Sequence, residues 1–260
     1  MMKPSRSFAL LLGVVALAGC DQDAVQISSI TAPVVGARVK FFNFGINAPQ
    51  VNFYAGNTKV TAISSTTGTE STVGVAYGAV AAGNNYIALA PGQTTFSGRI
   101  SAAVDKDLPI ASIPATLEDR RAYSVYLSGF YNTTTKQVEG FVVPDNFPDT
   151  LDYSQALVRF VNASPNAQPM QLTLREPVAG TEITVGGAIA YRAAGVFVGV
   201  PTGSYDLTTR ISGSTAAAIT RTAVSFLPGR VYTVTARGDM TLPTAGTAVN
   251  RPFLDNSINR

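Results

Sequence analysis

The sequence predicts an all-β protein that consists of two tandem Ig-like or Greek-key β-sandwich domains. Apolar residues recur at every second position over short runs, as at Tyr123, Val125 and Leu127, and this spacing is typical of strands. Gly, Pro, Asn and Thr separate the runs, and no stretch after the first twenty residues keeps the spacing of an amphipathic helix beyond a turn or two. We therefore expect many short strands and little helix.

Internal repetition predicts the division into two domains. The segment Ala37–Asn43 (ARVKFFN) returns as Ala156–Asn162 (ALVRFVN), at an offset of 156 − 37 = 119 residues. Two further echoes follow in the same order: residues 121–129 with 230–238, and residues 86–92 with 196–203. The repeats are expected at residues 37–147 and 155–260, joined by a polar linker at 148–154.

Composition excludes several classes of function. The 260 residues include no His, no Trp and one Cys, and these side chains carry most nucleophile–base catalysis and transition-metal binding. The net charge is only +3 and no run of basic residues interleaved with aromatic residues occurs, so no nucleic-acid partner is expected. The prediction is a protein without enzymatic activity, cofactor or metal.

The N-terminus reads as a secretory leader. Two basic residues in Met1–Ser7 precede the apolar run Phe8–Ala18, which is too short to span a bilayer. The following Leu17–Cys20 resembles the lipobox of bacterial lipoproteins, and this resemblance implies cleavage after residue 19 and lipidation of Cys20. Residues 20–36 then form a lipidated N-terminus and flexible tether. The predicted location is the cell envelope, at the inner or outer membrane, facing the periplasm or the exterior.

A family resemblance is carried by the second repeat. The segments Leu157–Ala167 (LVRFVNASPNA), Pro201–Gly203 and Gly229–Val234 resemble the "domain of unknown function 4397" family. The first repeat departs from the pattern, since Phe44–Asn47 replaces the Ala-Ser-Pro-Asn stretch. The resemblance implies an all-β, secreted or surface-anchored module that often occurs in tandem, and it supplies no catalytic motif.

Few residues are candidates for a site. The motif Asn162–Asn166 is expected to close a rigid turn, with a glycan or peptide contact as the alternative. The candidate carboxylates are Asp105, Asp107, Glu118, Asp119 and the linker acids Asp145, Asp149 and Asp152. Their turn-rich, polar surroundings favour solvated surface charge. Paired-carboxylate catalysis, or Ca²⁺ binding by the linker acids, is the less favoured interpretation.

Two further sets of residues receive structural interpretations. Tyr123 and Tyr232 occupy equivalent positions in the repeats and are expected to be buried, each with its hydroxyl reaching a backbone acceptor at a corner of the sandwich. Arg38, Lys40 and Arg159 alternate with apolar neighbours, so their charged ends are expected to face solvent.

The combined prediction is a lipid-anchored, non-enzymatic binding or structural module. Its expected partners are the membrane, through Cys20, and an envelope protein or a cell-wall polysaccharide. One alternative is a His-independent hydrolase that uses two carboxylates. The other is an assembly module that exchanges β-strands, suggested by the Thr- and Ser-rich runs at residues 64–72 and 212–222.

Overall fold

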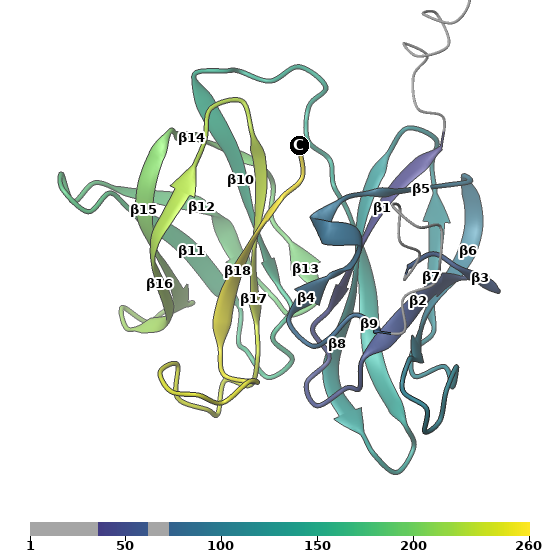
Figure 1. The fold of residues 1–260 in the computed structure, drawn as a ribbon. Coiled ribbons are helices and arrows are strands. Elements are labelled where there is room, and N and C mark those ends of the chain that lie inside the picture. The colour runs from purple at the N-terminus through teal and green to yellow at the C-terminus, as the bar shows by residue number, and fades with distance from the viewer. Residues whose placement is uncertain (1–35, 62–72) are drawn as a thin grey trace, which may run out of the picture. The chain divides into compact units, whose positions relative to one another are not determined.

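The two copies of the repeated segment are equivalent strands in two β-sandwiches (Figure 1). The structure is a computed structural model, and it describes residues 36–61 and 73–260. Residues 36–260 form one compact unit. Cys20, the leader and the run at residues 64–72 lie outside the described residues.

The first sandwich contains two sheets. Its strands are β1 (Ala37–Asn43), β2 (Val51–Ala55), β3 (Thr58–Lys59), β4 (Ala79–Val80), β5 (Ile87–Leu89), β6 (Gly92–Ile100), β7 (Ile113–Leu117), β8 (Ala122–Asn132) and β9 (Gln137–Pro144). One sheet has the order β4-β1-β8-β9, with β5 also paired to β1, and the other has the order β3-β2-β6-β7. A 3₁₀ turn at Ala81–Asn84 follows β4.

The second sandwich repeats this topology strand for strand. Its strands are β10 (Gln155–Asn162), β11 (Met170–Arg175), β12 (Glu182–Ile189), β13 (Ala193–Ala194), β14 (Val198–Pro201), β15 (Gly203–Ile211), β16 (Ala217–Phe226), β17 (Val231–Arg237) and β18 (Phe253–Ile258). The sheet orders are β13-β10-β17-β18, with β14 also paired to β10, and β12-β11-β15-β16. The all-β prediction with two sandwiches is confirmed.

Strand register confirms the internal duplication. β1 and β8 are parallel, with Arg38 opposite Ala122, and β10 and β17 are parallel, with Leu157 opposite Val231. The two offsets, 157 − 38 = 119 and 231 − 122 = 109, are those of the sequence echoes. The strands of the first sandwich end before residues 148–154, and those of the second begin after them. The domain limits 37–147 and 155–260 stay predictions.

Each sandwich has its own hydrophobic core between its two sheets. In β1 the residues Ala37, Val39 and Phe41 point into the first core, and in β10 the residues Val158 and Phe160 point into the second. Fully burying a valine or phenylalanine side chain contributes about 1.5–3 kcal/mol. The alternation that predicted the strands therefore also selects the face that each strand turns to its core.

A third apolar cluster joins the two sandwiches. It contains Phe42, Phe44, Tyr126, Phe141 and Val143 of the first repeat together with Val161 and Ala163 of the second. Phe42 stacks on Tyr126 with ring centroids 4.5 Å apart, and Tyr126 stacks on Phe141 at 5.0 Å. The β1 and β10 sheets are thus covered on both faces, by a core on one side and by the other repeat on the opposite side.

The prediction that two equivalent tyrosines are buried is confirmed, but the direction of their hydrogen bonds differs from the expected one. Tyr123 and Tyr232 are buried at equivalent corners. Their hydroxyl oxygens accept hydrogen bonds from the backbone N–H groups of Glu118 and Leu227, at 3.0 and 3.1 Å. The backbone partner is therefore a donor instead of the expected acceptor, and each bond spans five residues.

We predict that Gly238→Ala destabilises the fold by about 2–5 kcal/mol, the sum of left-handed strain and overpacking. Gly238 has φ +101°, and a Cβ there would lie 2.3 Å from the carbonyl oxygen of Arg251. The matched control is Gly246→Ala, because Gly246 has φ +113° and open space around it. Urea unfolding should show a loss of about 1–2 kcal/mol for the control. Equal losses in the two variants would contradict the close contact.

Candidate functional site

Three charged residues are buried where the two repeats meet. Lys40 and Arg159 are each 1% exposed and Asp145 is 4% exposed. The prediction that Lys40 and Arg159 turn their charged ends to solvent is wrong, because the other repeat covers the face of the sheet that lies away from the core. We call Lys40, Asp145 and Arg159 the buried charge cluster.

Arg159 makes the contacts that connect the repeats most directly. Its Nη2 forms an ion pair with Asp145, whose side chain is fully buried. Its Nη1 donates to the carbonyl oxygen of Pro144 at 2.8 Å, and its Nε donates to Thr233 Oγ1 at 2.9 Å. The charged guanidinium therefore donates hydrogen bonds both within the second repeat, to Thr233, and to the first repeat at the end of β9.

Lys40 makes the reciprocal contact in the opposite direction. Its Nζ donates to the carbonyl oxygen of Ile258, in the last strand of the second repeat, and to Asn84 Oδ1 at 3.2 Å. Lys40 Nζ also lies 4.5 Å from the ring centroid of Tyr86, and the guanidinium carbon of Arg159 lies 4.8 Å from that of Phe197. Each cation therefore lies over an aromatic ring of its own repeat.

The cluster follows the internal symmetry except at one position. Tyr123 pairs with Pro144 and Tyr232 pairs with Ile258, so Asn259 is the equivalent of Asp145. Ser124 donates to Asp145 at 2.9 Å, and the equivalent Thr233 donates to Asn259 at 2.7 Å. The cluster therefore holds two cations and one carboxylate, with a neutral amide where symmetry would place the second carboxylate.

Tyr86 connects the two halves of the cluster. Its hydroxyl donates to Asp145 Oδ2 at 2.6 Å and accepts from Asn259 Nδ2 at 2.7 Å. Burial raises the pKa of Tyr86, and the neighbouring Asp145 carboxylate raises it further. Tyr86 therefore remains a neutral hydrogen-bond donor across the physiological pH range.

Burial lowers the pKa of Lys40 from 10.5 to about 8. The attraction of Asp145 opposes this shift, and the repulsion of Arg159 adds to it. A buried ammonium is costly because water no longer solvates it, and one carboxylate cannot compensate two cations fully.

A second ion pair lies elsewhere along the same contact. Arg237, in β17, pairs with Asp255 in β18. Its guanidinium carbon lies 5.5 Å from the ring centroid of Phe44 and 5.0 Å from that of Tyr77, both in the first repeat. The apolar cluster between the repeats is thus accompanied by the buried charge cluster and by a cation of the second repeat that lies over two aromatic rings of the first.

The candidate carboxylates do not come together. Asp145 is buried, which corrects the expectation of a solvated linker acid. Asp105 pairs with Lys136 at 2.6 Å, Asp107 accepts from Tyr54 at 3.1 Å, and Glu118 lies 3.7 Å from Arg121. Asp119 accepts from the N–H of Gly36, while Asp149 and Asp152 are exposed. Within residues 36–61 and 73–260, no group of three acidic or cysteine side chains is placed to hold a metal ion.

The motif Asn162–Asn166 closes a turn, as the structural interpretation predicts. Asn162 Oδ1 accepts from the N–H of Ser164 at 3.1 Å, and Ser164 Oγ donates to the carbonyl oxygen of Gly238 at 2.6 Å. Asn166 donates to Asp239 at 2.7 Å and accepts from the N–H of Met240 at 3.0 Å. These side chains hold the turn against the loop after β17, and the alternative of a ligand contact gains no support.

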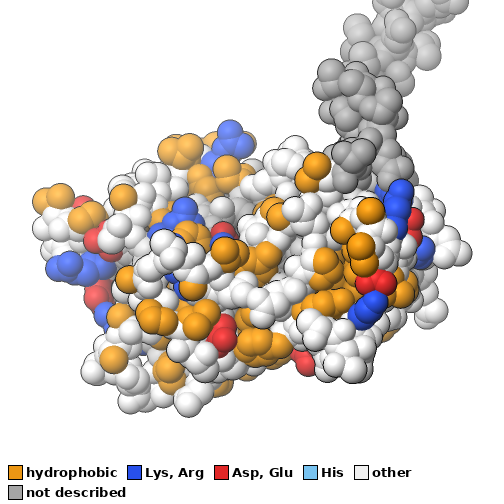
Figure 2. Space-filling model, turned by 60° about the horizontal axis from the view of Figure 1, so that its bottom comes forward, with side chains coloured by type: hydrophobic (Ala, Val, Ile, Leu, Met, Phe, Trp, Pro, Cys, Tyr) orange, Lys and Arg blue, Asp and Glu red, His pale blue; other side chains and the backbone are white. Residues whose placement is uncertain are grey.

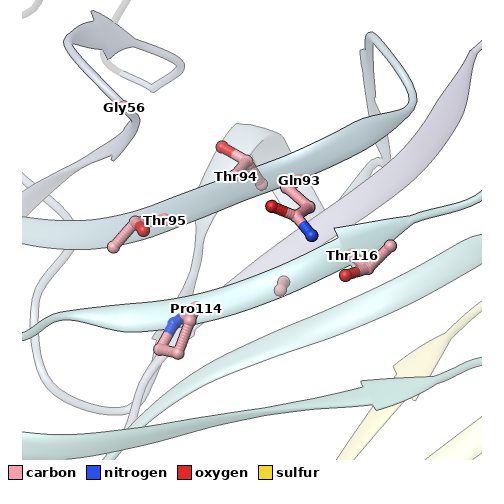
Figure 3. A pocket seen from close by; sticks show the side chains of 7 residues that line it. Gly56, Gln93, Thr94, Thr95, Pro114 and Thr116 are labelled. Carbon is pink, nitrogen blue, oxygen red and sulfur yellow. The ribbon is translucent and has the colours of Figure 1, made fainter.

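Three cavities differ in the chemistry of their linings. The first, of about 730 Å³, follows β6 and β7 and is lined by Gly56, Gln93, Thr94, Thr95, Pro114, Ala115 and Thr116 (Figure 3). The second, of about 490 Å³, includes Glu118 and Arg121. The third, of about 510 Å³, lies between the repeats and includes Arg159, Arg192 and Phe197. No cavity of the three is lined by two carboxylates.

The face drawn in Figure 2 shows charged side chains scattered in small groups among polar and hydrophobic ones. This face carries no extended basic area of the kind that nucleic-acid binding requires. Among the described residues, no helix is long and apolar enough to cross a membrane.

Comparison with known families gives one assignment. A family model described as "Domain of unknown function (DUF4397)" matches residues 37–173, which are 137 of the 260 residues. The chain belongs to this family. The match covers the first repeat and continues to β11 of the second, whereas the sequence motifs placed the resemblance mainly in the second repeat.

The other comparisons add little to the family assignment. No curated protein matches the chain. A leucine-rich repeat protein from Bacteroides thetaiotaomicron is a similar solved structure, at 12% identity over 79% of this chain and 26% of that one, with a TM-score of 0.21. The chain therefore spans about a quarter of that structure's length, and a TM-score this low supports no argument.

We predict that Asp145→Asn lowers the free energy of unfolding by about 3 kcal/mol or more, because it leaves the buried Arg159 and Lys40 without a counter-charge. The matched control is Asp105→Asn, which removes an exposed ion pair and should cost less than about 1 kcal/mol. Urea unfolding measures both. Similar small losses in the two variants would show that the buried pair does not hold the repeats together.

We also predict that stability rises between about pH 8 and pH 10 because of Lys40. In that window the unfolded chain binds a proton at Lys40 that the folded chain has released, so the free energy of unfolding increases with pH. Above about pH 10 tyrosine ionisation opposes the gain. Lys40→Met should remove the rise, which is measured as the difference between two pH profiles of urea unfolding. Parallel profiles would contradict the lowered pKa.

Proposed function

We propose that this protein is a lipid-anchored envelope lipoprotein whose two β-sandwich repeats serve as a non-enzymatic binding or structural module. The leader at residues 1–19 and the cysteine that follows it support the anchor. Two or three acyl chains hold a folded domain at a membrane almost permanently, since each buried CH₂ contributes about 0.8 kcal/mol. The partner is an envelope protein or a cell-wall polysaccharide.

One observation carries the non-enzymatic part of the proposal: the acidic side chains of the described residues are engaged singly, in ion pairs or hydrogen bonds, or are exposed. Asp145, which is buried, and Asp255, which is partly buried, each pair with an arginine. Glycoside hydrolysis requires two carboxyl groups that face each other about 5–10 Å apart across a substrate site. None of the three cavities supplies two, so the hydrolase alternative gains no support.

The alternative of strand exchange would use the edge strand β16 in the described part of the chain. Residues 212–222 form the turn after β15 and the first part of β16, which is an edge strand of its sheet. Edge strands have backbone groups free to pair with another chain. β16 pairs on one side with β15, and nothing in its contacts identifies a partner strand.

Lipidation is tested with the full-length protein expressed in a bacterial host that is fed a clickable palmitate analogue. We expect the wild-type chain to carry the label and to start at Cys20. The thiol sulfur bonds to the glyceryl carbon of a phospholipid, the bond from that carbon to the phosphate oxygen breaks, and the phosphorylated headgroup leaves with the thiol proton before the leader is removed. Cys20→Ser should lose the label and keep the precursor mass. The control Asp21→Asn leaves the acceptor intact and should remain labelled. Label on the Cys20→Ser chain, or a different mature start, would contradict the proposal.

A further inference from the structure

The two repeats differ at the edge of the contact between them. In the first repeat, six residues (81–86) separate Val80 from Ile87, the residues paired with Phe42 and Val39. In the second repeat, three residues (195–197) separate the equivalent Ala194 and Val198. The second repeat therefore lacks three residues at the place where the first repeat forms its 3₁₀ turn.

The shorter connection leaves Arg159 under the ring of Phe197 but without a partner equivalent to Asn84. The 3₁₀ turn of the first repeat supplies Asn84, whose side-chain oxygen accepts a hydrogen bond from Lys40. The shorter connection in the second repeat provides no equivalent group over Arg159. A cavity of about 510 Å³ that is half open to solvent lies beside Arg159, and its volume is within the range of small-molecule sites.

The charge around this cavity is unbalanced. Lys40 and Arg159 are buried beside a single carboxylate, because Asn259 stands where symmetry would place a second one. The Arg159 side chain is only 2% exposed, and Arg159 lines the cavity. An anion placed in the cavity would compensate the excess charge in a medium where Coulomb interactions are stronger than in water.

A second cation lies at the cavity in an unfavourable backbone conformation. Arg192 lines the cavity with φ +66°, and the equivalent position in the first repeat is Gly78, with φ +79°. Glycine is the residue best suited to this conformation, and an arginine there costs free energy. Arg192 is half exposed and lies 3.9 Å from Glu139, a separation at which an exposed ion pair is weak.

The rest of the lining is mostly apolar. It includes Val143 and Pro148 from the first repeat and its linker, and Leu157, Ala194 and Phe197 from the second. We propose that this cavity binds a small organic carboxylate with an apolar body, with the carboxylate on the side of Arg159 and Arg192 and the body against the apolar lining. The site uses residues of both repeats, and its existence does not depend on lipidation of Cys20.

The test uses the mature protein in lipid nanodiscs and isothermal titration calorimetry, with empty nanodiscs subtracted. The probes are hexanoate, hexanol and inorganic phosphate. We expect hexanoate to bind at least tenfold more tightly than either other probe, because only hexanoate combines the charge with the apolar chain. Equal binding of hexanol would reduce the site to an apolar cavity, equal binding of phosphate would reduce it to an anion site, and no hexanoate binding would reject it. Each of these three results overturns the proposal.

Two variants locate the binding. Arg192→Gly introduces the glycine that the first repeat has at the equivalent position. We expect about two- to fivefold weaker hexanoate binding, because one exposed charge contact is lost. The free energy of unfolding should not decrease. Its matched control is Arg120→Gly, an exposed arginine with φ +62° that is not in the cavity lining, and binding should not change. Equal effects of the two changes would contradict the location.

The second variant replaces Gly195 and Val196 with the five residues 81–85 of the first repeat. The longer connection should fill the cavity beside Arg159, as the 3₁₀ turn fills the equivalent space beside Lys40, and hexanoate binding should fall more than tenfold. A urea unfolding curve with an unchanged slope verifies that this chimera is folded. Undiminished binding by the folded chimera would overturn the proposal, and Arg192→Gly provides the independent test if the chimera does not fold.

Discussion

The buried ion pair between Arg159 and Asp145 is the interaction on which the arrangement of the two repeats depends. Both side chains are removed from water, and a buried charge is tolerated only when a counter-charge and further hydrogen bonds replace the lost solvation. Thr233, Pro144, Ser124 and Tyr86 supply those bonds. Moving the repeats apart would break this ion pair and its hydrogen bonds, and no other groups among the described residues are placed to replace them. The ion pair therefore favours one arrangement of the two repeats.

The contact has the geometry of a symmetric dimer contained within one chain. Lys40 of the first repeat donates to Ile258 of the second, and Arg159 of the second donates to Pro144 of the first. In a twofold interface the same face is used on both sides, so each contact occurs twice. Here the face is the outer side of the β1 and β10 sheets. The aromatic stack of Phe42, Tyr126 and Phe141 belongs to one side only, so the two sides have diverged in the apolar part.

Local patterning was sufficient to predict the strands, the duplication and the buried tyrosines, because each depends on alternation or on repeated segments. The burial of Lys40, Arg159 and Asp145 could not be predicted in this way. Alternation shows which residues face away from a core, but it does not show whether another layer covers them. One signal was present: Phe42, Phe44, Tyr126 and Phe141 are large apolar residues on the face assigned to solvent. Aromatic residues at such positions indicate a second covered face.

The differences between the repeats fall at the same place, and they are physically connected. Asn259 removes a negative charge, the shorter connection at residues 195–197 opens a cavity, and Arg192 adds a positive charge beside it. Each change by itself removes a favourable charge interaction from the cluster or opens space beside it. Burial lowers the pKa of Lys40, and the repulsion of Arg159 adds to this shift while the attraction of Asp145 opposes it. A bound anion would compensate the excess positive charge of the cluster. A ligand that binds only the folded chain also raises the free energy of unfolding by mass action. The stability of the contact between the repeats and the occupancy of the cavity are therefore coupled, so hexanoate should raise the urea midpoint of the wild-type chain more than that of Arg192→Gly.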